Sequence, residues 1–122
     1  MDNFIEEALR TESSLNPLSE TYEEKSARLL HAAIGLVTVS GEFIDALKKF
    51  LFYGRPLDLV NLKEELGDIL WYAAVAMSAL DTTFEEEMDR VIRKLRTRYP
   101  EKFTTDAAIN RNLFSERNEL EK

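Results

Sequence analysis

Apolar residues recur at helical spacing along most of the chain. Between residues 23 and 52 they stand three, four or seven positions apart, at Leu29, Ala33, Leu36, Val37, Phe43, Leu47 and Phe50. This spacing predicts one long amphipathic helix. Thr21 and Glu24 stand three apart as in a capping box, which predicts that the helix starts just after Thr21. Tyr53-Gly54-Arg55-Pro56 predicts its end, with Gly54 in the left-handed conformation.

A second long helix is expected to follow. Asp58 is a favourable N-cap, and the apolar face after it consists of Leu59, Leu62, Leu66, Ile69, Leu70, Ala73 and Met77. A short helix over residues 2 to 11 is expected to precede both long helices. Asn16-Pro17 would end that segment, because proline cannot continue a helix.

The rest of the chain predicts two more helices and no strand. Thr83 and Glu86 form a second capping box at the start of a helix that runs to Pro100. Residues 104 to 120 predict a final amphipathic helix. No apolar and polar alternation of the β type is present, so the expected fold class is all-α. We expect one domain over residues 1–122, with a core at about 22–100 and the C-terminal helix at about 104–120.

Composition narrows the chemistry that is open to this chain. It has 122 residues, 16 Lys and Arg against 23 Asp and Glu, a net charge of −7, one histidine and no cysteine. These counts exclude disulfides, thiolate zinc sites and a multi-histidine site, and they argue against binding a nucleic acid polymer. The acidic N-terminus is unlike a signal peptide. The most apolar stretches, Leu29–Val39 and Ile69–Leu80, are shorter than a bilayer span, so we expect a cytoplasmic protein without membrane contact.

The first long helix is too long for a compact monomer of this size. Thirty residues extend about 45 Å, whereas a globular domain of 122 residues is only about 35 Å across. Either Gly35 or Gly41 bends the helix, or a second subunit covers its excess apolar surface. The apolar content of the two long helices favours an oligomer.

Acidic residues form two pairs on the two long helices. Glu42 and Asp45 are three apart on the first, and Glu65 and Asp68 are three apart on the second, with Glu64 beside them. Residues three apart lie on one helical face. If the two faces meet, the carboxylates repel one another unless a hard cation such as Mg²⁺ lies between them. The alternative from spacing alone is a pair of solvated acidic faces.

The residues around these acids resemble a known family. Gly41-Glu42-Phe43 and the later block Glu64-Glu65-Leu66-Gly67-Asp68-Ile69-Leu70-Trp71-Tyr72 are similar to the signature of the MazG-like all-α nucleoside triphosphate pyrophosphohydrolases. The resemblance covers about residues 22 to 120 and is to the small phage and bacterial type. It implies a four-helix core, a homodimer or homotetramer, and cleavage of a nucleoside triphosphate and water into a monophosphate and pyrophosphate.

The resemblance also implies a site. Glu42, Glu65 and Asp68 match metal ligands for Mg²⁺, with Mn²⁺ as a possible substitute, and Glu64 is an accessory acid. A carboxylate not saturated by metal would orient or deprotonate the water, with Glu64 and Asp45 as candidates. On the fourth helix, Lys94 and Arg98 match substrate-binding positions and would stabilise phosphate charge. The neighbouring Arg90 and Arg93 are expected instead to pair with Glu86 and Asp89 on the helix surface.

Two residues depart from the family pattern. Val39 stands where the family has the first Glu of E-x-x-E, and Val91 stands where it often has Asn. Neither valine can contact a metal ion or phosphate through a polar atom. These two valines favour an inactive member, whereas Glu42, Glu65 and Asp68 together favour an enzyme. The main hypothesis is an active pyrophosphohydrolase. The alternatives are an impaired or inactive member that acts as a nucleotide-binding or assembly protein, and a phosphoribosyl-ATP pyrophosphohydrolase, whose motif surroundings are less similar.

Overall fold

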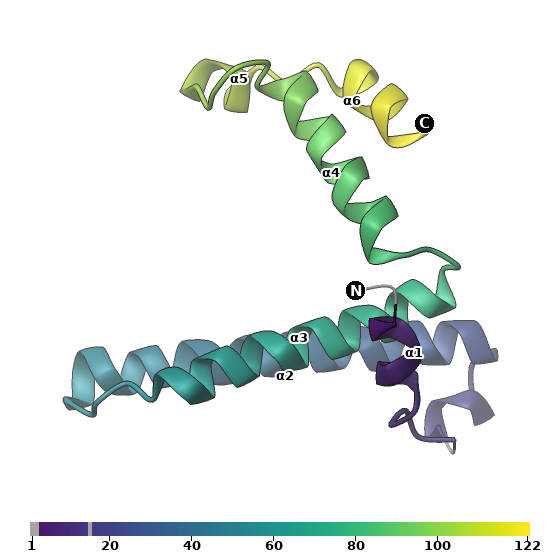
Figure 1. Cartoon of the computed structure of the whole chain (residues 1–122), viewed down its shortest axis with the longest axis vertical. Coiled ribbons are helices and arrows are strands. Elements are labelled where there is room, and N and C mark those ends of the chain that lie inside the picture. Colours follow the sequence, from purple (N-terminus) through teal and green to yellow (C-terminus); the bar gives the residue numbers. More distant parts are fainter. Residues whose placement is uncertain (1–2, 15) are drawn as a thin grey trace. The chain divides into compact units, whose positions relative to one another are not determined.

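The computed structural model of the chain describes residues 3–14 and 16–122, and within these residues it contains helices and no strand (Figure 1). The all-α prediction is therefore confirmed. The chain divides into two compact units, Met1–Asp81 and Thr82–Lys122, and each is described below by itself.

The first unit is built on two long helices. Helix α2 (Glu24–Tyr53) and helix α3 (Leu59–Ala79) lie side by side (Figure 1). Helix α1 (Phe4–Leu9) packs on α3, and the 3₁₀ helix η1 (Pro17–Glu20) packs on α2. The predicted short N-terminal helix and both long helices are confirmed. Helix α2 continues through both of its glycines over 30 residues, a length of about 45 Å.

The ends of the long helices follow their capping residues, with one exception. Gly54 ends α2 with a left-handed φ of 67°, and the Asp58 side chain caps α3 by accepting a hydrogen bond of 3.1 Å from the Asn61 N–H. The predicted capping box at Thr21 and Glu24 is wrong. Asn16 instead caps η1, which continues to its C-cap at Thr21. Helix α2 then begins after Glu23, which makes no side-chain capping bond.

Small side chains form the core between α2 and α3. The buried residues of α2 are Ala27, Ala32, Gly35 and Val39, and those of α3 include Ala74 and Val75. The segment after α1 is tied to this pair by polar contacts. The Arg28 guanidinium donates to the Glu12 carboxylate at 2.9 and 3.0 Å and to Ser78 at 3.1 Å, and the Trp71 indole donates to Thr11 at 2.7 Å.

Helix α2 is apolar enough to pass a simple test for membrane-spanning helices. One 18-residue window of α2 has a mean hydropathy of 1.4. This window is longer than the most apolar stretch of α2, Leu29–Val39. Length and composition alone are weak evidence, since core helices of water-soluble proteins pass the same test.

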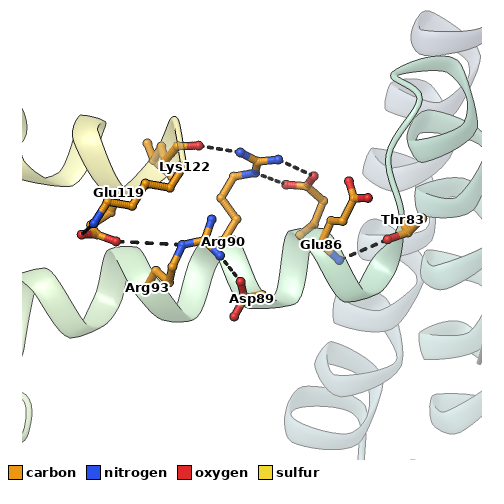
Figure 2. Close-up of polar contacts among 9 residues, drawn as sticks. Thr83, Glu86, Asp89, Arg90, Arg93, Glu119 and Lys122 are labelled. Carbon is orange, nitrogen blue, oxygen red and sulfur yellow. Dashed lines mark hydrogen bonds and ion pairs between the residues drawn. The ribbon is translucent and has the colours of Figure 1, made fainter.

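The second unit contains α4 (Phe84–Arg98), α5 (Thr105–Ile109) and α6 (Leu113–Leu120). Thr83 caps α4 as predicted by accepting a bond of 3.1 Å from the Glu86 N–H (Figure 2). The single helix predicted over residues 104 to 120 is wrong. Asn110 ends α5, and the Asn112 side chain caps α6 by accepting from the Ser115 N–H. Side-chain capping thus divides the segment.

Arginines of α4 hold α6 in place. Figure 2 shows Arg90 bound both to a carboxylate of its own helix and to the C-terminal end of α6. The acid that pairs with Arg90 is Glu87, at 2.8 Å, and not Glu86 as expected. Arg93 pairs with Asp89 as expected. Arg90 and Arg93 of α4 therefore serve packing within this unit.

Candidate active site

A buried glutamate lies at the centre of the acidic residues of the first unit. Glu65 of α3 is only 6% exposed and lies beside Glu42 of α2. One of its oxygens, Oε2, is buried without a hydrogen-bond partner. Burial raises the pKa of the Glu65 carboxyl, and the neighbouring carboxyl groups of Glu42, Asp68 and Glu64 raise it further. The structure thus brings together two of the predicted metal ligands from different helices.

Asp68 and Glu64 flank this pair. Asp68 is half-buried one turn beyond Glu65, while Glu64 is exposed, and both act on Glu65 through their charges. Within residues 3–14 and 16–122, no three acidic or histidine side chains are close enough together to hold a metal ion as they stand. The role of Glu42, Glu65 and Asp68 as metal ligands therefore stays a prediction.

Val39 is a buried apolar residue close to these acids. It lies one turn before Glu42 on α2 and is 5% exposed. A cavity of about 360 Å³ opens beside it, lined by Thr38, Val39, Glu42, Asp68, Trp71 and Tyr72. The lining of this cavity thus combines the apolar Val39 with the carboxylates of Glu42 and Asp68 and the rings of Trp71 and Tyr72.

The aromatic part of this cavity is a packed cluster. The rings of Trp71 and Tyr72 meet edge to face with centroids 5.0 Å apart, and His31 contacts Tyr72 in the same way at 5.9 Å. His31 is thus a packing residue. Trp71 and Tyr72 are half-buried at the edge of this cavity.

A second cavity, of about 310 Å³, is lined by both Glu42 and Glu65. Asp45 lines it but is engaged by lysines of its own helix, Lys49 at 2.8 Å and Lys48 at 3.3 Å. Hydrogen bonds from Lys49 and then Lys48 lower the pKa of the Asp45 carboxyl. Ion pairing thus opposes the predicted role of Asp45 as a base that activates water.

Comparison with known proteins identifies the family. The family model for the MazG nucleotide pyrophosphohydrolase domain matches residues 33–103, more than half of the chain. The chain belongs to the MazG family. The match begins in α2 and ends after α4, so the MazG domain extends over parts of both compact units. It contains all the predicted site residues.

A phage relative supports the assignment. The Gene 37 protein of Mycobacterium phage L5 is 34% identical over 77 residues, which represent 57% of this chain and 65% of the relative. The match thus spans less than two thirds of that relative's length. No solved structure matches the chain. The resemblance to small phage members of the MazG family is therefore confirmed at the level of sequence.

Three residues that line the second cavity were not predicted from the sequence. Lys49, Arg55 and Asn61 lie in its lining together with Glu42 and Glu65. Lys49 follows Glu42 by seven residues and Asn61 precedes Glu65 by four, so helical spacing could have placed Lys49 and Asn61 near the acids. Arg55 lies in the turn after Gly54, where no periodic signal exists.

The two predicted substrate-binding cations of this MazG chain belong to the second unit. Arg98 is bound in this structure to Glu116, with the shorter of two hydrogen bonds at 2.8 Å, and Arg111 binds the same carboxylate at 2.7 Å. Glu116 is only 2% exposed. Lys94 is half-exposed on α4. Their contact with substrate stays a prediction, and for Arg98 it would compete with Glu116.

Proposed function

We propose that this MazG protein is a divalent-cation-dependent nucleoside triphosphate pyrophosphohydrolase that releases a nucleoside monophosphate and pyrophosphate. The observation that supports this most directly is the buried Glu65 with an unpartnered Oε2 beside Glu42. Such an arrangement is unfavourable for the protein alone, because two carboxylates compete for one proton. It becomes favourable when a cation neutralises them.

The donor set fits a hard cation. Carboxylate oxygens are the ligands that Mg²⁺ and Mn²⁺ prefer, and Glu42, Glu65 and Asp68 are the residues that would hold the ion. When bound, the ion would supply charge neutralisation to the phosphate oxygens. Glu64 is exposed beside this set and is the better candidate to accept the proton of the attacking water, because Asp45 is held by two lysines. The cavity beside Trp71 and Tyr72 would take the base.

The same proposal includes a homo-oligomer. Four apolar residues of α2 stand seven apart and are exposed by 37 to 72%: Leu30, Val37, Ile44 and Leu51. A seven-residue apolar repeat is typical of a helix that packs along another helix. A dimer, or a tetramer built from dimers, would cover this stripe, and such a protein would work in the cytoplasm on free nucleotides.

Pyrophosphate release from a panel of nucleoside triphosphates, with and without Mg²⁺, tests the proposal. We expect release that needs the ion and that Glu65→Gln abolishes. The second candidate is a nucleotide-binding member without catalysis, which the buried Val39 favours because it supplies no ligand. Binding of triphosphates with no pyrophosphate release from any of them would establish that candidate instead.

A further inference from the structure

The cavity at the α2–α3 turn combines acids with cations. Its lining includes Glu42 and Glu65 as well as Lys49, Arg55 and Asn61. Glu42 and Lys49 are seven residues apart on α2, which corresponds to about 10 Å along the helix axis. The cavity thus leads away from the carboxylate pair, along α2, toward the two cations.

The cations are available for a ligand. The Arg55 side chain forms no hydrogen bond or ion pair with any residue in 3–14 or 16–122. Its backbone N–H donates to the Lys49 carbonyl at 3.2 Å, which folds the turn back over the end of α2. Among the residues that the structure describes, Lys49 forms an ion pair only with Asp45, and both side chains are more than 40% exposed. An exposed ion pair of this kind contributes little, so exchanging it for a ligand costs little.

A buried group in the same cavity also points to a ligand. Glu65 lines it, is 6% exposed, and has the unpartnered Oε2. The side chains of Lys49, Arg55 and Asn61 line the same cavity. The cavity therefore suits a ligand that carries several negative charges and that also reaches a metal ion held by the carboxylates. A polyphosphate chain has this character.

We infer that this cavity binds the β- and γ-phosphates of the substrate, with Arg55 and Lys49 as the phosphate ligands. The inference rests on the proposed function and extends it. Arg55 presents a planar donor fork that matches phosphate oxygens, Lys49 adds a point charge, and the Asn61 amide is a further donor. The reacting α-phosphate would then lie nearer to Glu42 and Glu65, and the leaving pyrophosphate would remain at the turn.

The test compares three variants by titration calorimetry in the presence of Mg²⁺. Arg55→Gln and Lys49→Gln remove one phosphate ligand each. Lys48→Gln is the matched control, because Lys48 is adjacent, pairs with the same Asp45, and does not line the cavity. The probes are inorganic tripolyphosphate, an α,β-methylene nucleoside triphosphate, and the unphosphorylated nucleoside.

We expect Arg55→Gln and Lys49→Gln each to raise the Kd of both phosphate probes about tenfold or more. The Kd of the nucleoside and the melting temperature should not change, and Lys48→Gln should bind as the wild type does. Phosphate-probe affinities within twofold of wild type, or an equal loss of nucleoside affinity, would overturn the inference.

The two hypotheses fail separately. If the wild type hydrolyses triphosphates while Arg55→Gln and Lys49→Gln keep its KM, the subsite is wrong and the proposed function stands. If the wild type releases no pyrophosphate but tripolyphosphate affinity depends on Arg55 and Lys49, the subsite is supported and the hydrolase is rejected.

Discussion

The ring of Tyr72 occupies the space that a side chain at Gly35 would need. A β-carbon at residue 35 would lie 2.1 to 2.4 Å from three ring atoms of Tyr72, far inside van der Waals contact. Tyr72 also lines the cavity beside Asp68. The missing side chain of Gly35 therefore allows α2 and α3 to approach and fixes one wall of the candidate site.

Gly35→Ala should destabilise the first unit. Tyr72 must move, and with it the edge-to-face contacts to His31 and Trp71, at a cost of about 1–3 kcal/mol in the free energy of unfolding. Urea denaturation measures this change. Gly67→Ala is the matched control, since nothing lies within 4 Å of its added β-carbon, and alanine there should stabilise α3 by up to about 1 kcal/mol. Equal effects of the two substitutions would contradict the close packing at Gly35.

The helix ends that were predicted correctly are those whose signal is local. Gly54 with its left-handed φ, and Asp58 and Thr83 as side-chain caps, act within one turn of their own position. The Thr21 prediction failed because the same residues also permit a 3₁₀ turn from Pro17. The final helix was predicted as one because its apolar spacing continues across Asn112, whose side chain caps a new helix instead.

The site was predictable to the extent that it depends on helical spacing. Glu42 and Glu65 were identified from their i,i+3 partners and lie together as expected. Asp45 forms ion pairs with Lys48 and Lys49, which compete with its predicted role as a base. Helical spacing alone does not decide whether such an acid pairs with lysines or with the other acids. Arg98 illustrates the same limit, because its partner Glu116 is 18 residues away in a different helix. Long-range pairs of this kind depend on tertiary packing.

Glu65→Gln should stabilise the metal-free protein at neutral pH. The pKa of Glu65 is raised by burial and by Glu42, so its favourable contribution is present below the usual pKa of 4.5 and is lost as pH rises through the folded-state value. Melting curves without divalent ion should show a higher melting temperature for the variant at pH 7 and a smaller difference near pH 4. Mg²⁺ should stabilise the wild type only. Glu64 is the exposed neighbour of Glu65, so Glu64→Gln is the control. A similar rise in melting temperature for Glu64→Gln would contradict the idea that burial makes the charged Glu65 unfavourable.

Ile44→Lys should disrupt the proposed oligomer. Ile44 is 62% exposed and belongs to the apolar stripe of α2 whose residues recur every seven positions. A lysine there would place a charge in the packed interface. Light scattering at micromolar concentration should give a multiple of 14.1 kDa for the wild type and a smaller particle for the variant. Phe114→Lys on α6 changes an apolar side chain that is 77% exposed and serves as the comparison. A wild-type particle of 14.1 kDa would reject the oligomer.

Glu116→Gln should remove a contribution to the stability of the second unit that is present at neutral pH and lost at low pH. Arg111 and Arg98 lower the pKa of the Glu116 carboxyl from 4.5 to about 2. A lowered pKa contributes stability above pH 4.5 that disappears as the pH falls toward about 2. The wild type should therefore melt at a higher temperature than the variant at pH 7, and the difference should vanish near pH 2. A pH-independent difference would show that Glu116 acts through packing rather than charge. Glu121→Gln, at an exposed pair with Arg117, is the control.

Val39→Glu distinguishes a weakened metal site from a repacked, inactive one. Residue 39 is 5% exposed and lies one turn from Glu42, so a glutamate there would place a further carboxylate at a buried position beside Glu42 and the buried Glu65. Without divalent ion we expect a loss of roughly 3 kcal/mol in the free energy of unfolding. Mg²⁺ should restore most of this loss and raise pyrophosphate release, because the new oxygen is a further hard ligand. Val39→Gln has the same shape without the charge and should respond less to the ion. Destabilisation that Mg²⁺ does not reverse, with no gain in pyrophosphate release, would mean that this face of α2 packs against α3 and binds no metal.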